Sequence, residues 1–84
     1  MEEYLFTFRS VTAAMQAGKE LERAGVAHLL VRLPKLLRGR GCGYGLKVRD
    51  SLFLRAKAAL SEAEVQPRGM YQRAADGQWR EVAQ

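Results

Sequence analysis

The order of hydrophobic patterns along the chain constrains its fold more than any other feature. Residues 4–8 (Tyr-Leu-Phe-Thr-Phe) are rich in β-prone aromatic side chains, which predicts a strand. Over 11–24 apolar or small residues recur at spacings of three and four, which predicts an amphipathic helix. Ser10 is its expected N-cap, and Gly25 is expected to follow its last turn. Residues 28–33 then predict a second strand, which Pro34 ends by removing a backbone donor.

The remaining half repeats this order. Residues 44–48 alternate between apolar and other side chains, which predicts a third strand. An apolar stripe over 52–63 predicts a second helix, capped by Asp50 or Ser51. Residues 65–73 read as extended chain, and Asp76-Gly77 is a strong turn signal. Residues 79–82 are therefore expected to pair back on 70–74.

Two strand–helix–strand halves with right-handed connections predict a ferredoxin-like α+β sandwich of βαββαβ order. The expected architecture is an antiparallel sheet with two helices on one face and a small C-terminal hairpin. The 84 residues are enough for one domain, 1–84. Because a domain of this size buries only roughly 60–65% of its unfolded surface, we expect any chemistry to lie at the surface.

Basic residues are concentrated in the middle of the chain. The whole sequence has a formal charge of +5, but residues 32–57 alone contain eight basic residues and one acidic residue, a net +7. The other residues together carry −2. The middle segment is thus where an anionic ligand or partner is expected.

The single cysteine, Cys42, lies inside this basic segment between Gly41 and Gly43. One cysteine and one histidine exclude an internal disulfide and a Cys-rich zinc site, and we expect no resident metal or cofactor. The flanking glycines remove side chains that would shield the sulfur. Nearby cations favour the thiolate over the thiol, and Arg38, Arg40 and Lys47 are the predicted stabilising or docking residues.

Targeting signals are not expected. The N-terminus, Met1-Glu2-Glu3, is acidic where a secretory signal would be basic, and no apolar run is long enough to cross a bilayer. We therefore expect a cytoplasmic protein without a membrane partner, whose lone thiol stays reduced.

Several motifs together resemble one known family. They are the opening run 4–10, the helix that ends at Ala24-Gly25-Val26, the strand that ends in Leu33-Pro34, the Cys42-Gly43-x-x-Leu46 element and Gly69-Met70-Tyr71. This pattern, over about residues 4–73, is similar to the selenium/sulfur carrier protein-like family. One difference is that this chain has Arg38-Gly39-Arg40-Gly41 where the family commonly has serines before its Cys-Gly.

The resemblance implies a small ferredoxin-like carrier, rather than a turnover enzyme, that holds sulfur or selenium on Cys42 as a persulfide or selenosulfide. Its expected partners are a sulfur or selenium donor, such as a cysteine desulfurase, and an unidentified acceptor. Three alternatives stay open. Cys42 is a small core hydrophobe, the basic segment binds RNA or an acidic protein while Cys42 is incidental, or the protein is a metal or redox sensor that works as a homodimer through Cys42. A nucleophilic pair of Cys42 with His28 would need the fold to bring the two residues together, and an exposed or structurally bonded His28 is favoured over it.

Overall fold

The computed structural model describes residues 2–40 and 43–82, with the backbone alone for Gly39 and Arg40. These residues form five strands, two α-helices and two 3₁₀ helices. In chain order the elements are β1 (Glu3–Thr7), α1 (Val11–Arg23), β2 (Leu29–Arg32), η1 (Lys35–Arg40), β3 (Tyr44–Arg49), η2 (Asp50–Leu52), α2 (Phe53–Glu62), β4 (Gly69–Arg73) and β5 (Trp79–Glu81).

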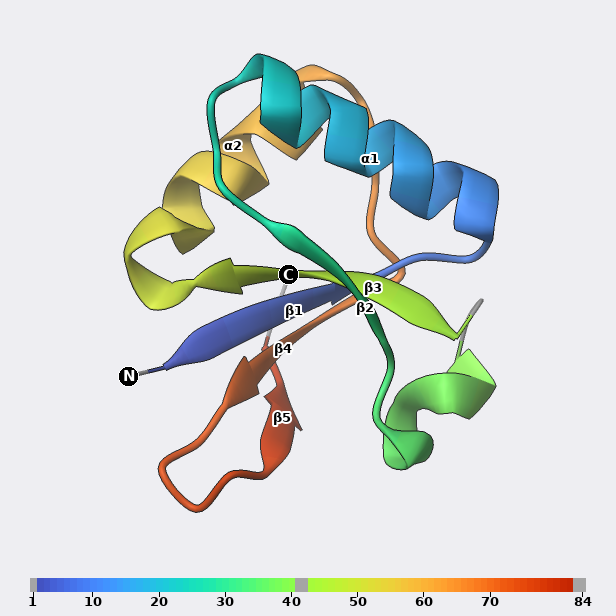
Figure 1. Ribbon diagram of the computed structural model, residues 1–84, viewed down its shortest axis with the longest axis vertical. Coiled ribbons are helices and arrows are strands. Elements are labelled where there is room, and N and C mark those ends of the chain that lie inside the picture. Colours follow the sequence, from blue (N-terminus) through green and yellow to red (C-terminus); the bar gives the residue numbers. More distant parts are fainter. Residues whose placement is uncertain (1, 41–42, 83–84) are drawn as a thin grey trace.

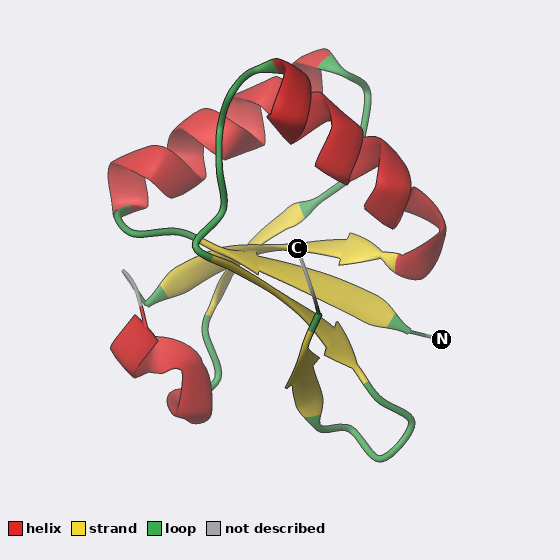
Figure 2. Cartoon of the chain, turned by 180° about the vertical axis from the view of Figure 1, so that it is seen from behind, coloured by secondary structure: helices red, strands yellow, loops and turns green. Residues whose placement is uncertain are grey.

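The strands form one sheet in the order β2-β3-β1-β4-β5, and each neighbouring pair is antiparallel. Figure 1 shows α1 and α2 on one face of this sheet and η1 on the other, and the view from behind in Figure 2 agrees. The predicted α+β architecture, with two helices on one face of an antiparallel sheet, is therefore confirmed.

The main core lies between the sheet and the two α-helices. Because side chains alternate along a strand, Phe6 of β1 and Leu46 of β3 point toward the helices. They meet Ala14 and Leu21 of α1, and all four residues are at most 1% exposed. Phe53 of α2 stacks on Tyr4 with ring centroids 3.8 Å apart. Burying such side chains is worth about 1.5–3 kcal/mol each, and this face supplies most of the apolar burial.

A second, smaller core covers part of the opposite face. Leu5 and Tyr71, neighbours in the β1–β4 ladder, pack there with Leu33 and Leu37. Gly45 allows this contact, because a Cβ at this position would lie 2.9 Å from Leu33 Cδ2 and 2.6 Å from the Phe6 carbonyl oxygen. Leu33 therefore lies against the backbone of β3, and it brings η1 onto the sheet.

Most local predictions are confirmed, and one is wrong. Ser10 caps α1, since its Oγ accepts the N–H of Ala13 at 3.0 Å, and Gly25 follows with φ +75°. The C-terminal hairpin forms with Tyr71 opposite Glu81. Neither Asp50 nor Ser51 caps α2: both lie in η2, and the N-cap, Leu52, has no side-chain oxygen to accept a capping hydrogen bond. The chain enters α2 through this tight 3₁₀ turn.

We predict opposite effects on stability for two glycine-to-alanine substitutions. Gly45→Ala should lower the free energy of unfolding by about 2 kcal/mol, because its Cβ meets backbone and packed side chains. Gly18→Ala should raise it by up to about 1 kcal/mol, because its Cβ meets only ordinary contacts at 3.5 and 3.9 Å and alanine favours the helix. Urea denaturation measures both values. Equal losses in the two variants would contradict the proposed close approach at Gly45.

Candidate functional site

The loop between β2 and β3 contains most of the predicted site. Gly41 and Cys42 lie outside the described residues, as does the side chain of Arg40. Both ends of the loop are described: the N–H of Leu33 donates to the Gly43 carbonyl oxygen at 2.8 Å. This hydrogen bond continues the β2–β3 ladder by one pair and closes the loop at its base. The position of the loop relative to the sheet is thus set by Leu33, whose side chain is 1% exposed.

The η1 segment of the loop is attached to the same residue. Arg38 is exposed, yet its Nε donates to the Leu33 carbonyl oxygen at 3.1 Å. The N–H of Leu37 donates to the Pro34 carbonyl oxygen at 2.8 Å, and the Leu37 side chain packs into the second core. Both backbone polar groups of Leu33 are therefore paired within the loop. Of the predicted cations, Arg38 has a direct structural role here.

Gly43 ends the loop in a left-handed backbone conformation, with φ +86°. A Cβ there would meet no atom within 4 Å, so the preference for glycine at this position comes from the backbone angle. Gly43 thus makes two contributions to the loop. Its carbonyl oxygen holds the N–H of Leu33, and its positive φ turns the chain into β3.

Basic residues from distant parts of the sequence meet at one end of the sheet. Thr7, the last residue of β1, pairs with Gly45 and Gly69, which lie near the starts of β3 and β4. We call the end of the sheet at which β1 ends and β3 and β4 begin the basic end. The cations at or next to it are Arg9, Arg32, Lys35, Arg38 and Arg68. Within residues 2–40 and 43–82, no carboxylate lies within salt-bridge distance of Arg9, Arg32, Lys35 or Arg38.

Carboxylates gather at the opposite end of the sheet, where β1 begins. They are Glu2, Glu3, Asp50 and Asp76. Glu3 forms ion pairs with Arg73 at 3.0 Å and with Lys47 at 3.5 Å. Burial raises the pKa of Glu3, but its hydrogen bond to Arg73 and the charge of Lys47 outweigh burial and lower the pKa. Burial, with the charges of Asp50 and Glu2, raises the pKa of Tyr4.

The structure therefore separates the basic residues of 32–57 and does not bring them all together at the β2–β3 loop. Lys47 faces Glu3, and Arg49 is opposite Glu3 in the β1–β3 ladder, so both lie toward the acidic end. Lys47 is about 13 Å along the chain from Gly43, at ~3.3 Å per strand residue. Arg9 and Arg68 join the basic end from outside residues 32–57. Their positions depend on strand pairing, so no local sequence signal identified them.

The other singled-out residues have structural contacts. The Nδ1–H of His28 donates to the Val26 carbonyl oxygen at 2.9 Å, and its Nε2 faces Gly18 of α1. Phe6 and Phe8 are fully buried, so neither offers a face on which an RNA base could stack. Trp79 packs against the second core, and the Arg73 guanidinium lies 5.8 Å from its ring centroid.

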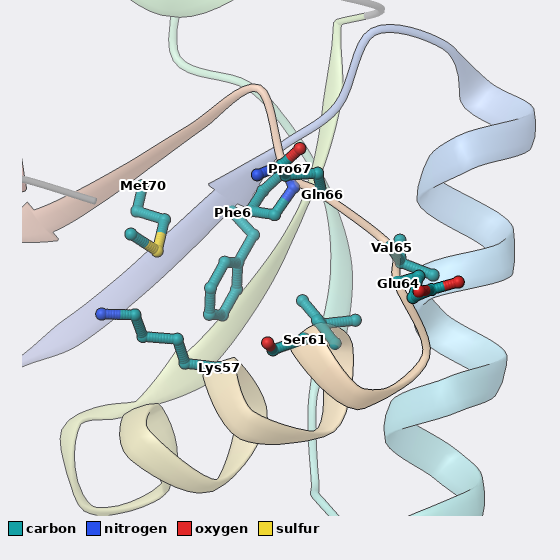
Figure 3. A pocket seen from close by; sticks show the side chains of 9 residues that line it. Phe6, Lys57, Ser61, Glu64, Val65, Gln66, Pro67 and Met70 are labelled. Carbon is teal, nitrogen blue, oxygen red and sulfur yellow. The ribbon is translucent and has the colours of Figure 1, made fainter.

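A pocket of about 430 Å³ lies on the helical face, between α2 and the adjoining strands β1 and β4 (Figure 3). Its lining is mostly apolar, with Phe6 and Met70 from the sheet and Leu60 and Val65 from α2 and the chain after it. Its polar lining residues are Lys57, Ser61, Glu64 and Gln66. The second core with η1 lies on the other face, so this pocket is separate from the η1 side of the loop.

The described part of the chain contains neither a metal-ligand cluster nor a membrane-spanning helix. Residues 2–40 and 43–82 contain no group of three or more metal-ligating side chains. The same residues form no helix that is long and apolar enough to cross a membrane.

Comparison with known proteins assigns the family. The family model described as "Putative Se/S carrier protein-like" matches residues 3–72, and the chain belongs to this family. No curated protein and no solved structure matches the chain. The matched range includes both α-helices, the β2–β3 loop and nearly all of β1 to β4, so the resemblance seen in the sequence motifs is confirmed.

We predict that Gly43 positions the thiol and that Gly25 provides a matched control. Each has positive φ and open space where a Cβ would lie, so Gly43→Ala and Gly25→Ala should each cost about 1–2 kcal/mol of stability. Only Gly43→Ala should change the rate at which iodoacetamide alkylates Cys42. An unchanged rate in Gly43→Ala, or an equal change in both variants, would contradict a positioning role.

The Glu3 ion pairs predict a defined pH dependence. Because the pKa of Glu3 is lower in the folded protein, its contribution to stability is present above the ordinary value of 4.5 and is lost as the pH falls through the folded pKa. Glu3→Gln should lower the free energy of unfolding at pH 7 by up to about 1 kcal/mol, with little difference from wild type near pH 2. Glu62→Gln, an exposed change on α2, is the control. A Glu3 effect that persists unchanged at low pH would rule out the ionic origin.

Proposed function

We propose that this protein carries sulfur or selenium as a persulfide or selenosulfide on Cys42. Family membership over residues 3–72 is the observation that carries the proposal. Cys42 is the only thiol in the sequence, so a thiol-based carrier of this family has one candidate attachment atom. The site residues proposed with it are Arg38, Arg40 and Lys47 as cations, and Gly41 and Gly43 as the flanking glycines.

The transfer step is a thiol–persulfide exchange. The Cys42 thiolate attacks the terminal sulfur of a donor persulfide and forms a new S–S bond, while the donor's own S–S bond breaks. The electron pair of that bond leaves on the donor cysteine as a thiolate, and the proton of the terminal sulfur stays with it or passes to water. No net oxidation occurs. With selenium, the same exchange forms an S–Se bond, and a second exchange delivers the atom to an acceptor.

The charge distribution supports the chemistry. The attacking thiolate and the product persulfide are both anions, and four cations at the basic end have no carboxylate partner among the described residues. Of the predicted stabilising cations, Arg38 is attached to the loop itself through Leu33. Lys47 is paired with Glu3, so we propose a smaller contribution from Lys47 than from Arg38.

The proposed partners follow from the same site. A carrier exchanges its cargo with a donor and an acceptor, and a cysteine desulfurase is the donor class that presents a protein persulfide. We also propose that the fold is ferredoxin-like, because the order β2-β3-β1-β4 with two helices on one face fits that topology, to which β5 is added. A cytoplasmic location would keep the thiol reduced for this exchange.

Intact mass spectrometry tests the proposal directly. After incubation with a cysteine desulfurase and cysteine, the wild-type protein should gain the mass of one sulfur atom, and dithiothreitol should remove it. Cys42→Ser should gain nothing. Absence of the gain in the wild type, or the same gain in Cys42→Ser, would overturn the assignment of Cys42 as the carrying residue.

Paired charge variants test whether the basic end stabilises the thiolate. Replacing Arg32 and Lys35 with glutamine should raise the pKa of Cys42, measured from the pH dependence of alkylation, by roughly half a unit to one unit. Replacing Arg49 and Arg55, which removes the same charge elsewhere, should leave this pKa within about 0.2 units, because exposed charges beyond a Debye length are screened. Equal shifts in both pairs would mean that total charge, rather than position, sets the reactivity.

The alternative is a basic module that binds RNA or an acidic protein while Cys42 is incidental. It predicts a salt-sensitive affinity that persists in Cys42→Ser. Such binding without any sulfur gain on the wild type would favour this alternative over the carrier.

A further inference from the structure

The β2 edge of the sheet has fewer of the features that prevent strands of two molecules from pairing than the β5 edge. In the described sheet β2 has β3 on one side and no strand on the other. Its residues are Leu29, Leu30, Val31 and Arg32, so three successive aliphatic residues precede its single charge. The opposite edge, β5, is three residues long and contains Arg80 and Glu81. Short, charged edges resist pairing, whereas an apolar edge invites it.

The register identifies which backbone groups of β2 face outward. Leu33 and Gly43 form a hydrogen-bonded pair that continues the β2–β3 ladder. Hydrogen-bonded and non-hydrogen-bonded pairs alternate in an antiparallel ladder, so Val31 and Leu29 also bond to β3. The N–H and C=O groups of Leu30 and Arg32 therefore point away from β3, toward the open edge.

Apolar side chains are exposed on both faces of this edge. Leu29 is 61% exposed and Leu30 is 53% exposed, and as consecutive strand residues they project to opposite faces. Leu30 lies on the helical face, because it pairs with the core residue Leu46. Val11 and Met15 of α1 are 43% and 55% exposed. They lie on the same face of α1 as Gly18, and Gly18 faces His28, the residue just before β2. Solvent-facing strands normally have polar side chains on at least one face.

We propose that β2 pairs antiparallel with β2 of a second copy of this chain, across a two-fold axis at Leu30, and so joins two sheets into one. Leu30 then exchanges both of its outward hydrogen bonds with Leu30 of the partner subunit. Leu29 lies opposite Val31 of the partner subunit, and Arg32 lies opposite His28 of the partner subunit. An isologous contact of this kind needs only one self-complementary strand.

A second copy fits this edge because the register with the axis at Leu30 places apolar residues opposite each other at its centre, whereas registers shifted toward Pro34 are disfavoured. A two-fold axis at Arg32 would place two like charges directly opposite each other, which is destabilising. An axis at Val31 would pair residue 28 with Pro34, which has no N–H to donate. The axis at Leu30 avoids both problems and keeps the apolar residues at the centre. Because the pairing is antiparallel, the two β2–β3 connections leave the paired strands at opposite ends.

The first test compares two identical substitutions at exposed leucines. Sedimentation equilibrium of wild-type protein at about 100 μM should detect dimers, as expected for a small, weak interface. Leu30→Lys should raise the dimer dissociation constant at least about tenfold, because two lysines meet on the axis and two leucine contacts are lost. Leu54→Lys, at a 75% exposed position on α2, should leave it unchanged. A monomeric wild type, or an equal effect of both substitutions, would overturn the proposal.

The second test traps the register and does not depend on the carrier function, because it uses Cys42→Ser protein. Leu30→Cys should form a disulfide-linked dimer with oxidised glutathione, since residues of a hydrogen-bonded antiparallel pair lie about 5.5 Å apart, within disulfide range. Leu54→Cys in the same background should cross-link at least about tenfold more slowly, because its cysteines meet only by random collision. Equal rates for the two cysteines would overturn this register, while circular dichroism verifies that each variant is folded.

Discussion

The close approach of Leu33 to the backbone at Gly45 determines how the β2–β3 loop attaches to the sheet. Without a Cβ at Gly45, the Leu33 side chain packs between Leu5 and β3, and it is almost fully buried. Its N–H and C=O then bind Gly43 and Arg38, which closes the base of the loop and holds η1 beneath the sheet. The absence of a Cβ at Gly45 thus allows the second core to form, and through Leu33 it also fixes η1 and Gly43 relative to the sheet.

The sheet also separates charge along its length. Antiparallel pairing brings the end of β1 next to the starts of β3 and β4, and cations from distant parts of the chain meet there. At the opposite end Glu3 binds Lys47 and Arg73, and Asp76 binds Arg80. Cations paired with carboxylates contribute little net field. The cations without such partners at the basic end therefore dominate the electrostatics around the base of the β2–β3 loop.

The repeated strand–helix–strand order was predictable because its evidence is local. Ser10 and Gly25 bound α1 through contacts within one helical turn, and Asp76-Gly77 predicts its hairpin from two residues. The η1 helix was not predicted, since its support comes from tertiary contacts of Leu33 and Leu37 rather than from helical periodicity. The start of α2 was mispredicted because Asp50 and Ser51 are suitable caps by type, but the chain places both in a 3₁₀ turn.

By itself, the sequence determined the α+β class, the lone cysteine between two glycines and the family to which the chain belongs. These properties depend on residue types and short spacings, which a linear pattern contains. Only the tertiary structure decided which cations share an end of the sheet with Gly43, that Lys47 pairs with Glu3, and that β2 is an open apolar edge. Each of these depends on strand order and register, which bring together residues that are distant in the sequence.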